Sequence, residues 1–247
     1  MNPSLVGSEM CIRDRQYLQR IMAQSSSDIQ AIAGSVSFAQ ARENPAALER
    51  YLDEQRQRLG LDFLYHLTNA KSKAAAKRWP VIAAAAAGGS QTSIDIFHAK
   101  DLKARSATLA HQASLPLIAT EAAVPTQRST EDRGMVVHSA TAIKTHRQSG
   151  VLVGGTLLNR NLNFIDTINA LVYRAKGSDR QGTATLFLED VRISTNVRLF
   201  EDVRALGTRV SAAVRSRVLD EGLTWLDRAF VVNDWYISGY QPITDSF

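Results

Sequence analysis

The sequence predicts an α+β protein in which a long N-terminal helix precedes two mixed modules. The first observation is a narrow apolar seam, spaced by three and four residues, which is typical of a long helix. The second is that residues 61–160 and 183–247 follow one plan of two strands, a helical middle and an antiparallel run of strands. No repeat is detectable at the level of residues, so the duplication concerns architecture only.

Residues 1–15, MNPSLVGSEMCIRDR, are interpreted as an artefactual leader and are left out of the fold prediction. They show no periodicity and resemble a translated sequencing-adapter fragment; the alternative is a genuine disordered start. The exclusion matters because the one cysteine of the chain, Cys11, lies in this segment. The rest of the chain then offers neither a disulfide framework nor a CxxC metal or redox motif.

Residues 16–60 are expected to form N-terminal stalk helices, the first of them over 16–42. Asn44 suits the N-cap of the second helix, Pro45 its first position, and Gly60 the position after its last turn. Two interpretations stay open: the helices pack against their own domain, or they form a stalk that continues a membrane helix and pairs in a dimer. The apolar seam consists of Leu18, Met22, Ser25, Ile29, Ile32 and Val36.

The module over residues 61–160 is predicted from alternating β-rich and helical stretches. Strands are expected at 61–68 and 92–99, a turn at NAKSK, and a short alanine-rich helix from Trp79-Pro80 to Gly88-Gly89. A helix over 101–113 and a loop with two prolines follow. The segments RGMVVHSATAIKT and GVLVGGTLLN then predict a hairpin across HRQSG.

Residues 161–182 are expected to be a connecting helix and a hinge, KGSDRQG. The module over 183–247 then begins with two strands, TATLFLED and VRISTNV, across an acidic turn, followed by a helix over 209–220. It ends in a hairpin of 229–232 and 235–243 across Asn233-Asp234. On its second arm Trp235, Ile237 and Ile243 share one parity, and Tyr236 and Tyr240 share the other.

Composition excludes several classes of function. No run approaches the roughly 20 apolar residues of a membrane span, the nearest being VIAAAAAGG. The net charge is +5, and KSKAAAKR is read as a solvated turn because no basic stripe interleaved with aromatic residues suggests nucleic-acid binding. No catalytic motif and no metal-ligand spacing of histidines is present, so we expect no enzyme activity, metal or cofactor in this chain. Glu189-Asp190 is read as a solvated turn rather than an acid/base pair.

Four segments have a distinctive order and spacing: GVLVGGTLLNRNLNFIDTINALVYR, GTATLFLEDVRISTNV, RALGTRV and RAFVVNDWYISGYQPITDSF. Together they resemble the double Cache sensor domain of bacterial membrane receptors. The most similar variant is the Cache 3/Cache 2 fusion of sensor histidine kinases and chemoreceptors. The resemblance extends from the strand at 61–68 to the end of the chain.

The resemblance implies two PAS-like modules with antiparallel sheets, a membrane-distal one over 61–160 and a membrane-proximal one over 183–247. PAS-like sheets run in the strand order two-one-five-four-three. WYISGYQPI would be strand four of the second module, which would then be truncated and lack its last, central strand. The implied protein is the periplasmic part of a bacterial inner-membrane receptor that binds a small molecule and forms a homodimer through its N-terminal helix.

Candidate ligand-binding residues follow from what a pocket for an organic anion requires. Arginine binds a carboxylate through two parallel hydrogen bonds, and tyrosine and tryptophan supply walls with one polar group. The resemblance favours the membrane-distal module, with the loop 116–132 as a lid; for each residue the alternative is a packing or surface role. The candidates are Tyr65, Trp79, Arg133 and His138 in the first module, and Arg228, Trp235, Tyr236 and Tyr240 in the second.

Two functional hypotheses follow from the resemblance. The first is the extracytoplasmic sensing domain of a receptor, either a two-component sensor histidine kinase or a chemoreceptor, with no catalysis in this chain. The second is a free-standing periplasmic binding protein built from the same modules. The ligand expected for either is a small organic anion such as a carboxylate.

Overall fold

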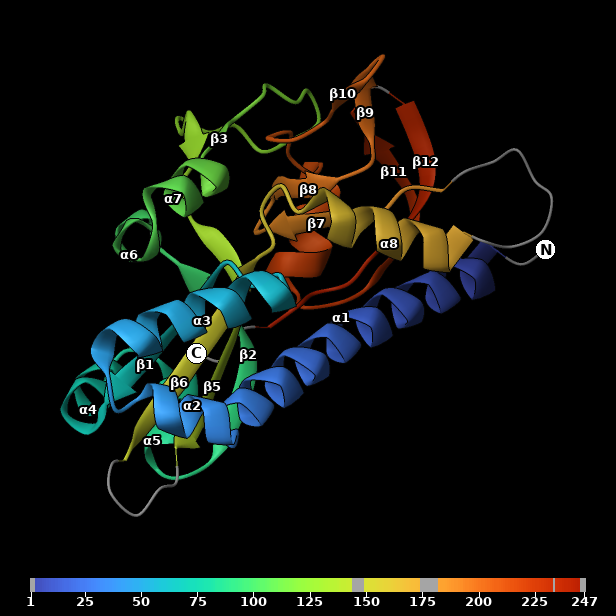
Figure 1. Ribbon diagram of the computed structural model, residues 1–247. Helices are drawn as coiled ribbons and strands as arrows, with labels where there is room; N and C mark the ends of the chain where they lie inside the picture. The colour runs from blue at the N-terminus through green and yellow to red at the C-terminus, as the bar shows by residue number, and fades with distance from the viewer. Residues whose placement is uncertain (1–2, 144–148, 174–181, 233, 245–247) are drawn as a thin grey trace. The chain divides into compact units, whose positions relative to one another are not determined.

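The computed structural model describes residues 3–143, 149–173, 182–232 and 234–244, and it confirms an α+β protein with antiparallel strand pairs (Figure 1). The described residues form two compact units. We call residues 19–96 and 135–157 the sheet unit, and residues 97–134 and 158–244, with the start of the first helix, the hairpin unit. Unlike the predicted modules, these units place residues 97–134 with the C-terminal strands.

The sheet unit is built on one four-stranded sheet, in the order β1-β6-β5-β2. Both β1 and β5 pair antiparallel with β6, so that Phe63 and His138 lie opposite Gly155 from its two sides. Its elements are the C-terminal part of α1 (Pro3–Ala33), α2 (Val36–Ala41), α3 (Pro45–Leu59), β1 (Phe63–Thr68), α4 (Asn69–Ala76), α5 (Pro80–Ala86), β2 (Ser90–Phe97), β5 (Gly134–Ile143) and β6 (Gly150–Leu157).

The order of these strands differs from the predicted PAS-like order. In the order two-one-five-four-three the first two strands are neighbours, whereas β1 and β2 lie at opposite edges of this sheet. The two strands of the hairpin, β5 and β6, occupy the centre, and all but one residue of β5 is buried. A strand covered on both faces is expected to be largely apolar rather than alternating. In β5 the buried polar residues His138 and Ser139 depart from this expectation, and each has a polar partner, Asp95 and Ser25 respectively.

The N-terminal helices follow their predicted end signals but contain an additional break. The Asn44 side chain accepts hydrogen bonds from the backbone N–H groups of the first turn of α3, Pro45 opens the helix, and Gly60 closes it with a φ of 64°. The predicted single helix over 16–42 is wrong, because the Ser35 side chain caps a new helix, α2, by accepting from the Phe38 N–H. At its other end, α1 extends to Pro3 and includes most of the segment interpreted as a leader.

The apolar seam of α1 packs inside the sheet unit. Ile29 and Ile32 belong to a buried cluster with Leu64 of β1 and Leu152 of β6. Ser25 is buried as well, and its Oγ lies 2.7 Å from Ser139 Oγ of β5. These seam residues are therefore used within the chain, the first of the two interpretations that the sequence left open, whereas Val36 is exposed.

Two local predictions are corrected, one in the sheet unit and one in residues 101–113. NAKSK is not a turn but the first part of α4, in which Ser72 is buried and its Oγ donates to the Asn69 carbonyl at 2.9 Å. The single helix predicted over 101–113 is divided at Ser106, whose side chain accepts from the Thr108 N–H and starts a second helix. A serine that caps a helix competes with continuation of the preceding one.

The hairpin unit consists of short strand pairs and helices. Its helices and strands are α6 (Ala99–Arg105), α7 (Ala107–Ala113), β3 (Leu115–Pro116), β4 (Thr130–Glu131), α8 (Leu162–Tyr173), β7 (Thr185–Leu188), β8 (Val191–Thr195), β9 (Arg198–Phe200), β10 (Val203–Arg204), α9 (Ala212–Arg215), the π-helix η1 (Ser216–Asp220), β11 (Trp225–Val231) and β12 (Asp234–Tyr240). The pairs are β3–β4, β7–β8, β9–β10 and β11–β12.

The predicted connecting helix and the acidic turn between β7 and β8 are confirmed. A C-terminal hairpin is present, but its bounds differ from the predicted 229–232 and 235–243: Asp234, predicted in the turn, pairs with Val231 and belongs to the second strand. The buried face of α8 is formed by Phe164, Ile165 and Ile168, whereas Leu162 is exposed. The hinge up to residue 181, the turn residues 144–148 and Asn233 lie outside the described residues. Across the described helices, none is both long enough and apolar enough to span a bilayer.

His66 of β1 supplies a prediction about pH. Burial lowers the pKa of His66 and the nearby Arg42 guanidinium lowers it further, so the neutral ring is favoured in the folded state. Its stabilising effect is complete above the unfolded pKa of about 6.5 and is lost as the pH falls through the folded pKa. His66→Gln is expected to flatten the fall in the free energy of unfolding between pH 7.5 and 5.5, measured by urea denaturation.

The control for this measurement is His111→Gln, because His111 is exposed on α7. That variant is expected to keep the wild-type slope of stability against pH. If the two variants have the same slope, titration of His66 does not contribute to the pH dependence.

Candidate functional site

A buried aromatic group in the sheet unit contains three of the predicted ligand residues. The Trp79 ring meets the His138 ring edge-on with centroids 5.3 Å apart, and Phe63 contacts His138 at 6.2 Å. Tyr65, half-buried on β1, contacts Phe63 at 5.9 Å. The structure therefore brings Tyr65, Trp79 and His138 together, through a phenylalanine that was not among the candidates.

His138 also forms a fully buried pair with Asp95 of β2. Its Nδ1 lies 2.8 Å from Asp95 Oδ2, and both side chains have an exposed fraction of 0%. Gly155 leaves space for the Phe63 ring that contacts His138, because a Cβ at this position would lie 2.4 Å from Phe63 Cζ. Sequence reasoning missed Asp95, although a carboxylate on the same strand parity as the buried Phe97 is an available signal.

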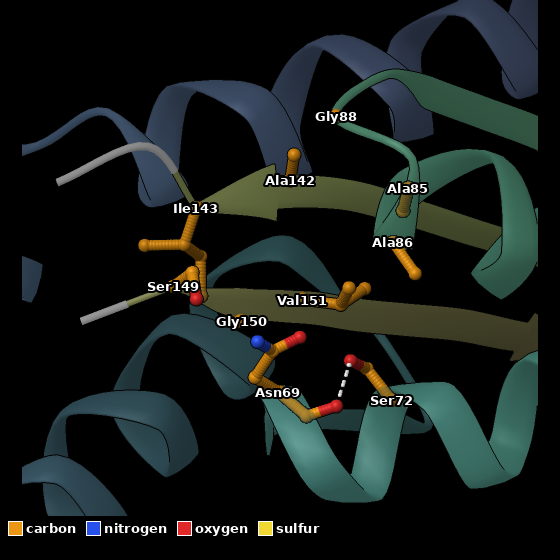
Figure 2. A pocket seen from close by; sticks show the side chains of 10 residues that line it. All are labelled: Asn69, Ser72, Ala85, Ala86, Gly88, Ala142, Ile143, Ser149, Gly150 and Val151. Atoms are coloured by element: carbon orange, nitrogen blue, oxygen red, sulfur yellow. Dashed lines mark hydrogen bonds between the residues drawn. The ribbon is translucent and has the colours of Figure 1, made fainter.

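A small cavity in the sheet unit does not coincide with these residues. It encloses about 220 Å³ between α4, α5 and the ends of β5 and β6 (Figure 2). Its polar groups come from Asn69, Ser72 and Ser149, and none of the described residues that line it is charged. None of the eight predicted residues borders it, so among the described residues this cavity offers no cation for recognition of an organic anion.

Arg133 lies in the hairpin unit, apart from the aromatic group with which it was predicted to act. Its Nε and Nη2 each donate to the buried Glu131 at 2.8 Å, and its Nη1 donates to Glu189 at 2.7 Å. Burial raises the pKa of Glu131, but hydrogen bonds from Arg133 and Arg128 outweigh it and lower that pKa overall. The guanidinium of Arg133 is thus engaged by two carboxylates.

The predicted lid also belongs to the hairpin unit. The backbone of residues 116–124 runs along residues 207–212: the Ile118 N–H donates to the Gly207 carbonyl at 2.9 Å, and the Ala212 N–H donates to the Ala122 carbonyl at 2.7 Å. Between them, the Arg209 N–H donates to Thr120 Oγ1 at 3.1 Å. These hydrogen bonds hold the first half of the loop against the segment that leads into α9.

The acidic turn after β7 is not simply solvated, as its sequence suggested. Asp190 is buried, and its Oδ2 accepts from Arg209 Nε at 3.0 Å. Glu189 is exposed but pairs with Arg133. Each carboxylate is therefore paired with an arginine, Glu189 with Arg133 and Asp190 with Arg209.

The four candidates on the C-terminal hairpin lie on two faces of it. Arg228 pairs with Ile237 and Phe230 with Trp235, whereas Ala229 pairs with Tyr236 and Trp225 with Tyr240. Side chains alternate along a strand, so Arg228 and Trp235 share the outer face, and Trp235 is 57% exposed there. Tyr236, half of which is exposed, and Tyr240 point to the other face, and only Tyr240 packs into the core cluster beneath the hairpin.

Tyr240 lies beside a buried arginine that the sequence reasoning did not select. The rings of Tyr240 and Phe187 have their centroids 5.8 Å apart. The buried arginine, Arg192, stacks its guanidinium over the same Phe187 ring, 5.1 Å from its centroid. Arg192 is 2% exposed, and its Nη1 donates to Thr208 Oγ1 at 2.6 Å. An arginine in VRIST, a strand otherwise made of β-branched and small residues, is the signal that was available.

Arg192 lies in a stretch of the chain that matches the model of a known protein family. Residues 156–247 match the model of single Cache domain 3. The matched part begins at the end of β6 and otherwise lies in the hairpin unit. The similarity of this part is thus to a Cache sensor domain, and the match covers the C-terminal part of the stretch, from residue 61 onward, in which the resemblance was expected. Cache domains are sensing domains rather than enzymes.

The comparisons with solved structures and with curated proteins add little to the family match. The periplasmic domain of Vibrio cholerae LuxQ is a solved structure that is 11% identical to this chain, with a TM-score of 0.39, covering 82% of this chain and 81% of that one. No curated protein matches the chain. For metals, the part of the chain that the structure describes contains no group of three histidine, cysteine or acidic side chains that could hold an ion.

Proposed function

We propose that this chain is the extracytoplasmic sensing domain of a transmembrane signal-transduction receptor, and that its ligand is a small organic anion. The observation that carries the proposal is the match of residues 156–247 to single Cache domain 3. The positive net charge of the chain, +5, and a buried arginine inside the matched region support an anionic ligand.

The receptor class in this proposal is a two-component sensor histidine kinase. Its support is the resemblance of the segments between residues 150 and 247 to the Cache domains of such kinases. A chemoreceptor and a free-standing periplasmic binding protein are the alternatives, and the domain encoded beside this stretch in the complete gene would distinguish them.

The proposed ligand groups differ between the two units. In the sheet unit, Tyr65, Trp79 and His138 would supply aromatic walls, and in the hairpin unit Arg133, Arg228, Trp235, Tyr236 and Tyr240 are the candidates. Of these, Tyr240 has the surroundings that a binding group for an anion needs, since an aromatic ring and a buried cation lie next to it.

A thermal-shift screen tests the function. Small carboxylic acids, amino acids, sugars and amines are added singly to the purified chain. We expect at least one carboxylate to raise the melting temperature by about 5–10 °C at a concentration of roughly 100 times its Kd. The reason is that such binding stabilises the folded state by about 2.7 kcal/mol.

Isothermal titration calorimetry of each hit then gives its Kd, and an unrelated protein of similar net charge controls for general salt effects. If no compound of any class raises the melting temperature or produces heat, the sensing function is refuted for this chain.

A further inference from the structure

Arg192 of β8 is a buried cation whose charge is not balanced by any carboxylate of the described residues. Three other arginines that link elements of the hairpin unit have one: Arg133 pairs with Glu131 at 2.8 Å, Arg204 with Asp166 at 2.9 Å, and Arg209 with Asp190. Removing a charge from water costs several kcal/mol unless an opposite charge or hydrogen bonds compensate it. Arg192 differs from these three because it is buried and has no carboxylate partner among the described residues.

The hydrogen-bonding capacity of Arg192 is also largely unused. A guanidinium carries five N–H donors, and one hydrogen bond from it, to Thr208 Oγ1, occurs among the described residues. Its Nε is buried and has no acceptor in that part of the chain. Thr208 accepts this hydrogen bond but supplies no negative charge, because its hydroxyl is neutral and donates its own proton to the Ala205 carbonyl at 2.7 Å.

An aromatic ring covers one face of the Arg192 guanidinium, and the Nε–H in its plane has no acceptor among the described residues. Phe187, its cross-strand neighbour, covers the face of the group at 5.1 Å, whereas the N–H donors point outward in the plane. Two adjacent donors in that plane match the two oxygens of a carboxylate. Tyr240, next to Phe187, contributes an aromatic wall and a hydroxyl.

The electrostatics agree with this geometry. Burial lowers the pKa of Arg192 to about 10, with only a small opposing contribution from Tyr240. Burial likewise raises the pKa of Tyr240, and Arg192 partly offsets that rise. Both groups are therefore in their protonated forms at pH 7 and can donate hydrogen bonds to an anion.

We infer that Arg192 anchors the carboxylate group of a small organic acid through its Nε–H and an Nη–H, with Phe187 and Tyr240 as the aromatic walls of the site. This inference rests on the proposed sensing function and deepens it by naming the anchor and the ligand class. It places the ligand in the hairpin unit rather than beside His138, where the resemblance alone had suggested it.

The test uses succinate and benzoate as probes, with succinamide and benzamide as uncharged matches and sulfate as an inorganic anion. Wild-type chain is expected to bind at least one of the two acids saturably in calorimetry and neither amide. Arg192→Met, which keeps the length and apolar character of the side chain, is expected to weaken that binding by roughly 10- to 100-fold. Arg192→Lys keeps the positive charge but lacks the planar guanidinium, so its affinity for the acid is expected to lie between those of the wild type and Arg192→Met.

The matched control is Arg198→Met, an exposed arginine of the same unit that is not among the candidate ligand residues, and it is expected to bind with wild-type affinity. Circular dichroism establishes that each variant is folded. A second readout on the native protein is the 15N resonance of Arg192 Nε–H, identified by its loss in Arg192→Lys. We expect it to shift during the acid titration and to remain in place with the amide, so the inference stays testable even if Arg192→Met fails to fold.

The outcomes separate the inference from the function. Unchanged affinity in folded Arg192→Met, an Nε–H resonance that does not move at saturation, or equal binding of sulfate would overturn the carboxylate anchor and leave the sensing function standing. Binding of sugars or amines alone would do the same. If no compound of any class binds, the sensing function itself is wrong.

Discussion

Replacing Gly207 with alanine is expected to destabilise the hairpin unit by about 2–5 kcal/mol, because two costs coincide at this position. The backbone of Gly207 has a φ of 79°, which a residue with a Cβ adopts at a cost of about 1–2 kcal/mol. In addition, a Cβ there would lie 2.1 Å from the Pro116 carbonyl oxygen, which is backbone and cannot rotate away. Urea unfolding measures the loss.

The same substitution is also expected to release the loop that begins at Pro116. Gly207 accepts from the Ile118 N–H, so displacement of either backbone breaks the first hydrogen bond that holds the loop. Limited proteolysis under native conditions should therefore cut the segment 116–132 faster in Gly207→Ala than in the wild type.

Gly222→Ala is the matched control for this prediction. Gly222 has a similar φ of 68°, but a Cβ added to it would meet nothing within 4 Å. That variant is expected to lose only the backbone cost of about 1–2 kcal/mol and to leave proteolysis of the loop unchanged. Equal losses of stability in the two variants would show that the close approach of Pro116 is unimportant.

Replacing Asp95 with leucine is expected to cost about 1–3 kcal/mol, which is the usual result of leaving a buried polar group without its hydrogen-bond partner. His138 would keep its place in the sheet, fully buried among Phe63 and Trp79, without the carboxylate that its Nδ1 contacts at 2.8 Å. The free energy of unfolding in urea, compared with that of the wild type, measures the loss.

The double variant Asp95→Leu/His138→Leu completes this experiment. Replacing both members of a buried pair with apolar side chains is often neutral or stabilising, so most of the lost stability should return. A double variant that is as unstable as Asp95→Leu alone would mean that the loss comes from packing of the leucine and not from the broken pair.

Local chemistry explains which parts of the fold could be predicted. Asn44, Pro45 and Gly60 act on backbone groups within a few residues of themselves, so the bounds of α3 are readable from the sequence. The break at Ser35 depends on the same kind of chemistry and was missed because the apolar spacing continues through it to Val36. In that case the periodicity outweighed a capping signal that was equally visible.

The candidate site depends instead on contacts between distant residues. Asp95 and His138 are 43 positions apart, and Arg133 reaches Glu189 across 56 positions. Nothing in the sequence fixes which strands are neighbours, so Arg133 was grouped with His138, although the two lie in different compact units. Arg192 was overlooked for the same reason, since its burial results from strand pairing and from α9 and the hairpin rather than from its own neighbours in the chain.

The way in which residues 116–124 are held has a consequence for how this chain can evolve. The loop contributes three backbone carbonyls or N–H groups and a single hydroxyl, that of Thr120, to its contacts with residues 207–212. Side chains such as Glu121 and Pro125 are exposed and take no part in those contacts. Substitutions in the loop can therefore change the surface that the loop presents. The hydrogen bonds that hold the loop to Gly207 and Arg209 need not change, because they depend mainly on the backbone of the loop.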